Sequence, residues 1–124
     1  MPDTLPIVYQ DEHLVVVDKP ANLLVHPSEI DRRETRSAMM MLRDQLGQWV
    51  YPVHRLDRPT SGLLVFALAP GIARTLATAF EERQVKKDYL AIVRGHPALG
   101  GLIRHALTLK DDRHSRRTLV GEAQ

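Results

Sequence analysis

Six consecutive apolar residues, Leu63 to Leu68, constrain the fold of this 124-residue chain more strongly than any other segment. The run lies between Gly62 and Pro70, two residues that interrupt regular structure. A short apolar run bounded in this way is typical of a strand that is covered on both faces. We therefore expect a buried strand here, with other segments of the chain packed against it.

The segment upstream of this strand is expected to hold two strands and a helix. Two runs rich in β-branched residues, Ile7 to Gln10 and His13 to Val17, are separated by Asp11-Glu12 and predict strands joined by a tight turn. Thr35 can cap a helix that ends near Gly47. Apolar residues at three- and four-residue spacing give this helix a predicted buried face of Met39, Leu42, Leu46 and Trp49.

Downstream of the apolar run, Pro70 suits the first turn of a second helix, whose apolar stripe is Ile72, Leu76, Ala79 and Phe80. Alternation over residues 88–94 predicts a further strand, and residues 102–109 a last one. The order of two strands, helix, strand, helix, strand, strand argues for an α+β fold with a mixed, largely antiparallel sheet and packed helices. Residues 1–124 carry no internal repeat or interdomain linker and read as one domain.

Composition excludes several classes of protein. The chain is 44% hydrophobic and 26% charged, which is ordinary for a globular domain, and it contains no cysteine for a disulfide or a thiolate metal site. No apolar run reaches membrane-spanning length, and the start of the chain lacks the features of a signal peptide, so a cytoplasmic protein is expected. The histidines lack zinc-like spacing, and phosphate-binding and dinucleotide-binding glycine motifs are absent, so neither a metal nor a cofactor is expected.

The loop that leads into the apolar run places a carboxylate in a structured turn. Asp57 lies between Arg55 and Arg58, and nearby cations keep a carboxylate ionised, as a nucleophile or an anionic base must be. Pro59 and Gly62 restrict the shape of the turn. The alternative is an ordinary surface turn in which Asp57 pairs with a neighbouring arginine.

Basic residues gather in three clusters although the net charge is only +2. Each cluster suits contacts with phosphates, but each is also compatible with an ordinary solvated surface. The clusters are Arg32, Arg33 and Arg36, then Arg83, Lys86 and Lys87, then Arg113, His114, Arg116 and Arg117.

Three segments together resemble the RluA-type pseudouridine synthases: HRLDRPTSGLLVFA at residues 54–67, DEHLVVVDKP at 11–20 and KDYLAIVRG at 87–95. Two shorter segments, LRDQLGQ at 42–48 and FEERQV at 80–85, are most similar to the TruC subgroup, which modifies uridine 65 of transfer RNA (tRNA). The resemblance implies the pseudouridine synthase fold, with an active-site cleft across its sheet, and the isomerisation of uridine to pseudouridine without a cofactor. The expected partner is RNA, most specifically tRNA.

The resemblance also implies roles for individual residues. Asp57 is the implied catalytic residue, and Tyr89 is expected to stack on the target ring. Arg55 is expected to stack and hydrogen-bond in the gap that the extruded base leaves in the RNA helix. Taken alone, Tyr89 fits a core aromatic on a strand better than a stacking residue, and Arg55 could simply pair with Asp57. The remaining expected RNA-binding residues are His54, Arg58, Thr60, Ser61, Lys19 and His26, of which His54 can also be structural. Asn22 stands where relatives more often have Gly, and Asn also tolerates a left-handed backbone.

The resemblance covers the N-terminal part of a pseudouridine synthase catalytic domain, with no separate RNA-binding domain. A later motif of these enzymes, T-G-R-x-H-Q-L-R, carries an arginine that pairs with the catalytic Asp and does not occur in this sequence. Two alternatives to a tRNA-specific synthase therefore stay open: a synthase that acts on ribosomal RNA, and an inactive fragment or RNA-binding or chaperone module. The sequence leaves the oligomeric state open.

Overall fold

The computed structural model describes residues 3–27, 36–104, 107–110 and 116–119, the last two ranges by their backbone alone. The chain divides into two compact units, Met1–Asp88 and Tyr89–Gln124, and each is described by itself.

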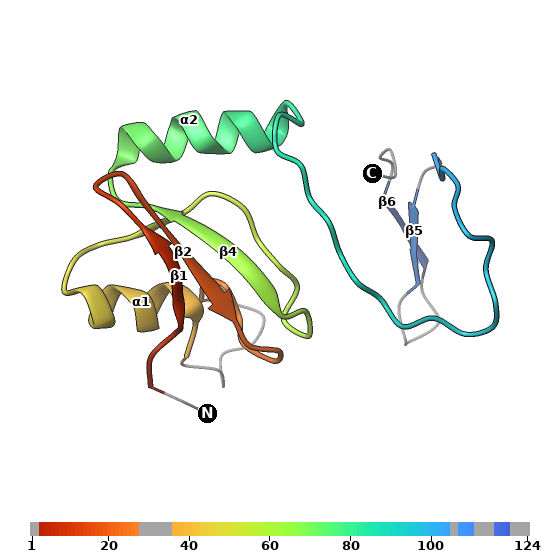
Figure 1. The fold of residues 1–124 in the computed structure, drawn as a ribbon, viewed down its shortest axis with the longest axis horizontal. Helices are drawn as coiled ribbons and strands as arrows, with labels where there is room; N and C mark the ends of the chain where they lie inside the picture. Colours follow the sequence, from red (N-terminus) through yellow and green to blue (C-terminus); the bar gives the residue numbers. More distant parts are fainter. Residues whose placement is uncertain (1–2, 28–35, 105–106, 111–115, 120–124) are drawn as a thin grey trace. The chain divides into compact units, whose positions relative to one another are not determined.

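A four-stranded antiparallel sheet organises the first unit (Figure 1). Its strands are β1 (Ile7–Gln10), β2 (Leu14–Lys19), β3 (Tyr51–Pro52) and β4 (Gly62–Ala67), arranged in the order β1-β2-β4-β3. Leu14 lies opposite Ala67, and Lys19 lies opposite Gly62. The segment that follows Lys19 and the segment that precedes Gly62 are therefore brought together at one end of the sheet.

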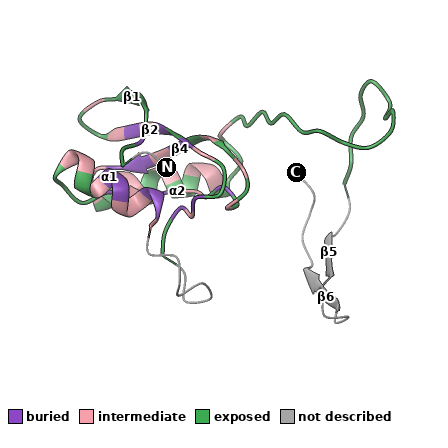
Figure 2. Ribbon diagram, turned by 90° about the horizontal axis from the view of Figure 1, so that it is seen from below, coloured by how far each residue is buried: buried purple, intermediate pink, exposed green. Residues whose placement is uncertain are grey.

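The core occupies one face of this sheet. Val15 and Val17 of β2 and Leu64 and Phe66 of β4 have no exposed surface, as the two-residue period of a strand requires for side chains that share a face. Helix α1 (Ala38–Leu46) packs against them, and Figure 2 shows buried residues on β2, β4 and α1. The strands predicted around residues 7–10 and 13–17 are confirmed, although β2 extends to Lys19.

Local hydrogen bonds fix both ends of α1. The Ser37 hydroxyl accepts a hydrogen bond from the Met40 N–H at 3.2 Å, and Gly47 ends the helix with a φ of 68°. Ser37 is thus the cap, whereas the predicted cap Thr35 lies outside the described residues. Met39 and Leu46 pack against the core and Leu42 is buried, but the prediction for Trp49 is wrong. Trp49 follows the helix end at Gly47 and is 52% exposed.

Removal of the Ser37 cap has a predictable cost. We expect Ser37→Ala to lower the free energy of unfolding by about 1 kcal/mol, because the Met40 N–H at the start of α1 loses its acceptor. Urea denaturation followed by circular dichroism measures the change. Ser61→Ala, at an exposed position, is the matched control and should change the value by less than about 0.5 kcal/mol. Equal losses in the two variants would contradict the assignment of Ser37 as the cap.

Helix α2 (Pro70–Glu81) lies on the side of the sheet opposite α1 (Figure 1). Its predicted apolar stripe is confirmed as the less exposed side of the helix, although no residue of α2 is fully buried. Ala67 is buried but Leu63, at the other end of β4, is 59% exposed. The prediction of a strand covered on both faces is therefore wrong at Leu63.

The second unit differs most from the sequence prediction. The strand predicted over residues 88–94 is not formed: the segment is irregular, and Leu90 and Ile92 are fully exposed. Within the described ranges, no strand pairs with this segment, and a strand needs such a partner for its backbone groups. Strands β5 (Leu107–Lys110) and β6 (Arg116–Leu119) form an antiparallel pair, so only the last three residues of the predicted strand 102–109 belong to β5.

The expected α+β class is confirmed. All ladders between the named strands of the described chain are antiparallel. Among the residues that the structure describes, the parallel pairing is an isolated bridge between Leu24 and Ser37, which places the segment after β2 beside the start of α1.

Candidate active site

The loop between β3 and β4 presents Asp57 to solvent. The Asp57 carbonyl accepts a hydrogen bond from the Thr60 N–H at 2.9 Å, which closes the turn, while Leu56 is buried beneath it. The Asp57 side chain is 79% exposed, and its carboxylate lies 3.9 Å from an Arg55 guanidinium nitrogen that is itself largely exposed. A pair this long between exposed groups contributes little to stability. Both groups therefore stay accessible to a ligand.

The Asp57 loop is tied to the turn that follows β2. The Arg58 carbonyl accepts hydrogen bonds from the Asn22 N–H at 2.7 Å and from the Lys19 ammonium at 3.2 Å. Asn22 has a φ of 67°, a left-handed backbone that Asn tolerates, so the departure from Gly is accommodated here. The two loops thus form one hydrogen-bonded unit at the end of β2 and β4.

Lys19 lies inside this unit rather than on its surface. Its side chain has no exposed area, and burial lowers the pKa of its ammonium, an effect that the negative charge of Asp57 opposes. Lys19 was expected to bind RNA, but the structure directs its ammonium to backbone carbonyls instead. The sequence contained no local signal for this burial.

His54 also has structural contacts. Its Nε2 accepts a hydrogen bond from the Val65 N–H of β4 at 3.0 Å, and its ring stacks on Phe80 of α2 with centroids 4.3 Å apart. Burial, and to a lesser extent the charge of Lys87, lowers the pKa of His54. A neutral ring with its proton on Nδ1 fits these contacts. The structural alternative for His54 is the one that this geometry favours.

The contacts of His54 predict a loss of stability in mild acid. Folding lowers the pKa of His54, so the unfolded chain binds a proton that the folded chain does not, and stability falls as the pH drops below about 6.5. Urea midpoints measured between about pH 7.5 and 5.5 test this. His54→Asn should flatten the dependence, whereas His96→Asn, at an exposed position in the second unit, should leave it in place. An unaltered slope in His54→Asn would refute the assignment.

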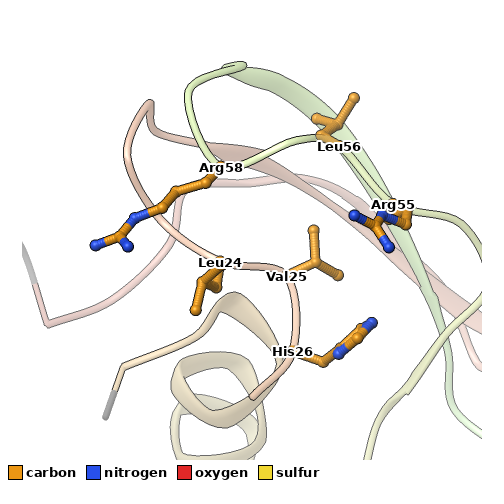
Figure 3. A pocket seen from close by; sticks show the side chains of 6 residues that line it. All are labelled: Leu24, Val25, His26, Arg55, Leu56 and Arg58. Atoms are coloured by element: carbon orange, nitrogen blue, oxygen red, sulfur yellow. The ribbon is translucent and has the colours of Figure 1, made fainter. Parts of the chain in front are cut away.

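A small surface cavity of about 110 Å³ lies beside the Asp57 loop. Its lining comes from two segments, the one after β2 and the Asp57 loop, and comprises Leu24, Val25, His26, Arg55, Leu56 and Arg58 (Figure 3). In Figure 3 the side chains of His26 and Arg55 lie on one side of the cavity and Arg58 extends toward the other. Three expected RNA-binding residues are thus brought together, around apolar side chains that sequence reasoning did not single out.

The other expected site residues are placed less decisively. Thr60 is half-buried and Ser61 exposed within the Asp57 loop. Tyr89 belongs to the second unit, where its side chain is 61% exposed and outside any strand, so its predicted stacking role stays a prediction.

The described residues contain no group of three or more His, Asp or Glu side chains that could hold a metal ion. None of the helices in the described part of the chain is long and apolar enough to cross a membrane.

Comparison with known proteins identifies the family. Residues 13–123 match the family model of RNA pseudouridylate synthases. The chain belongs to the RNA pseudouridylate synthase family. The match includes the loop that carries Asp57, and it confirms the family resemblance seen in the three sequence segments.

Relatives within the RNA pseudouridylate synthase family are substantially longer than this chain. The chain is 54% identical over 110 residues to the tRNA pseudouridine synthase C of Pasteurella multocida, covering 89% of this chain and 45% of that protein. It is 51% identical over 112 residues to the protein of the same name from Vibrio parahaemolyticus, covering 90% and 46% respectively. The chain thus spans less than half the length of these relatives.

A solved structure supports the same assignment. Human RNA Pseudouridylate Synthase Domain Containing 1 superposes with a TM-score of 0.66 and 32% sequence identity, over 89% of this chain and 41% of that one. The sheet and helices of the first unit are therefore part of the architecture of the RNA pseudouridylate synthase family.

Proposed function

We propose that this chain carries the catalytic carboxylate of a tRNA pseudouridine synthase, with Asp57 as the reacting group. The observation that supports this most strongly is an exposed Asp57 beside Arg55, on a loop whose backbone is anchored to the turn after β2, in a chain that belongs to the RNA pseudouridylate synthase family. The name of the relatives, tRNA pseudouridine synthase C, points to tRNA as the substrate. We also propose the cytoplasm as its compartment, because tRNA is abundant there.

The reaction suits a carboxylate. The bond between uracil N1 and ribose C1′ breaks, the ring turns, a bond forms between C5 and C1′, and the C5 hydrogen leaves as a proton while N1 gains one. Nothing is oxidised and no water is consumed. Asp57 can attack the sugar or the base, or remove a proton from the sugar, and it is released at the end of each cycle.

The surroundings of Asp57 suit an extruded nucleotide. Chemistry on a paired base requires its removal from the stack, at a cost of a few kcal/mol that stacking and gap filling offset. The exposed guanidinium of Arg55 can stack and hydrogen-bond in the vacated space. His26 and Arg58, on the same cavity, offer polar contacts to neighbouring phosphates, and Tyr89 supplies the stacking partner of the target ring in this proposal.

Release of tritium from C5-tritiated uridine in tRNA tests the function under single-turnover conditions. We expect release with a tRNA substrate and none with a ribosomal RNA transcript of similar length. If the 124-residue chain is inactive, a chimera in which it replaces the aligned 110 residues of the Pasteurella multocida relative supplies the remainder of that protein. A folded chimera that releases no tritium from either RNA would overturn the proposal, and release from ribosomal RNA alone would overturn the substrate assignment.

A further inference from the structure

The small cavity of Figure 3 has two walls that the fold holds in place. The first wall is the segment after β2, which is bonded to the start of α1. The Leu24 carbonyl accepts a hydrogen bond from the Ala38 N–H at 2.7 Å, and the Val25 carbonyl accepts one at 2.9 Å from Met39. The second wall rests on Leu56, which is buried in the core cluster. The shape of the cavity is therefore set before any ligand binds.

The polar side chains around the cavity each have a defined hydrogen-bonding role. Arg55 and Arg58 line it and can only donate. His26 also lines it, and its Nδ1 lies 3.2 Å from the Pro27 carbonyl oxygen. A carbonyl oxygen can only accept, so Nδ1 carries the proton and the Nε2 of the neutral ring is an acceptor. The cavity thus combines two donor side chains and one acceptor with an apolar lining.

A pyrimidine base has the complementary set of groups. The Watson–Crick edge of uracil carries two acceptors, O2 and O4, and one donor, N3–H. That of cytosine carries O2 and N3 as acceptors and its amino group as donor. Guanine has one acceptor and two donors along this edge, and adenine has one of each. A phosphate has only acceptors and would leave the Nε2 of neutral His26 without a donor.

The size and position of the cavity also fit one small base. Its volume of about 110 Å³ equals that of three or four water molecules at about 30 Å³ each, which suits the edge of a single ring. Asp57 is not among the residues that line it. Arg55 does line it and lies 3.9 Å from the Asp57 carboxylate, so the cavity is one side chain away from the proposed reacting group.

We propose that this cavity is a second nucleotide subsite, which binds the Watson–Crick edge of an unpaired pyrimidine that neighbours the target uridine in the RNA. His26 is the specificity-determining residue of this subsite, because it supplies the acceptor for the base. Proteins commonly recognise unpaired RNA bases along this edge. The inference rests on the proposed function, which places the target uridine at Asp57.

Nucleoside 5′-monophosphates test the subsite without any need for catalysis. In NMR titrations the methyl groups of Leu24, Val25 and Leu56 report on the cavity, and those of Val17 and Leu64 report on the core. We expect UMP and CMP to shift the cavity methyls alone, with Kd values in the millimolar range that agree within about threefold. AMP, GMP and 3-methyluridine 5′-monophosphate, which lacks the N3–H, should bind about tenfold more weakly.

The other results of this titration would overturn the inference. Equal binding of all four nucleotides, or the same shifts with inorganic phosphate at the same Kd, would identify an anion site. A preference for UMP over CMP of more than about tenfold would identify the cavity as the position of the target uridine itself.

Substitutions of His26 test its role in the subsite. His26→Gln keeps an acceptor oxygen and should retain the preference for pyrimidines, whereas His26→Phe should lose it. His13→Phe is the matched control, because His13 is an exposed histidine at the turn between β1 and β2, and it should leave the preference intact. If His26→Phe still prefers pyrimidines, His26 does not determine the specificity.

The tRNA assay separates failure of this inference from failure of the proposed function. We expect His26→Phe to raise the Kd for tRNA about fivefold while the single-turnover rate of bound tRNA stays within about threefold. An unchanged Kd would show that the RNA does not occupy the cavity and would overturn the inference. Pyrimidine binding in the cavity without tritium release by the folded chimera would count against the proposed function alone, whereas release without any pyrimidine preference would overturn this inference alone.

Discussion

Asp57→Asn should abolish pseudouridine formation, with a loss of roughly 10⁴-fold or more in single-turnover rate. The amide has nearly the shape of the carboxylate but can neither attack carbon as an anion nor accept the proton. Because the Asp57 side chain is 79% exposed and the turn is closed by its backbone carbonyl, the fold and the loop should be unchanged. Tritium release, measured in the chain or in the chimera described above, gives the rate.

The matched control is Asp18→Asn. Asp18 is an exposed carboxylate on β2, so its replacement changes the net charge and the attraction to RNA by the same amount as the Asp57 variant. We expect Asp18→Asn to keep at least about half of the reference rate. An Asp57→Asn variant that retained more than about a tenth of the rate would exclude Asp57 as the reacting group.

The parts of the candidate site that sequence could predict are those encoded locally. The Asp57 turn is defined by Pro59, Gly62 and the flanking arginines, and strand β4 follows from its own apolar run. The tolerance of Asn22 for a left-handed backbone likewise follows from residue type, and its φ of 67° uses that tolerance. Neighbours in the sequence carry enough information for each of these features.

The features that sequence missed depend on contacts between distant segments. Lys19 is buried because the strand register places it opposite Gly62 and because the Arg58 carbonyl accepts a hydrogen bond from its ammonium. The sequence around residue 19 predicts neither contact. From the sequence, His54 was a candidate RNA-binding residue. In the structure its ring accepts a hydrogen bond from the Val65 N–H of β4 and stacks on Phe80 of α2. Polar residues beside the proposed catalytic carboxylate can therefore stabilise the fold instead of contacting a substrate.

The same dependence explains the wrong predictions for strands and buried faces. Residues 88–94 alternate as a strand should, yet no described strand pairs with them and their apolar side chains remain exposed. Leu63 belongs to a continuous apolar run, but the layer over its face does not reach it. Periodicity identifies residues that are suited to burial, and only the tertiary neighbours decide whether they are buried.

The largest expected effect on stability is that of Phe66→Ala. The Phe66 side chain has no exposed surface and lies opposite Val15, in the cluster that joins β2 and β4 to α1. Its truncation should lower the free energy of unfolding by about 3–5 kcal/mol, through lost apolar burial and the cavity that remains. Urea denaturation followed by tryptophan fluorescence and circular dichroism measures the change.

Leu63→Ala provides the comparison within the same strand. Leu63 is 59% exposed, so the same kind of truncation should cost less than about 1 kcal/mol. Equal losses at Leu63 and Phe66 would contradict the assignment of the core to the α1 face of the sheet. Strand β4 begins at Gly62, directly after the Asp57 loop and opposite Lys19. A loosened strand at Phe66 should therefore also loosen the Asp57 loop. In Phe66→Ala we expect the Asn22 and Thr60 amides to lose protection from hydrogen exchange together with the core amides.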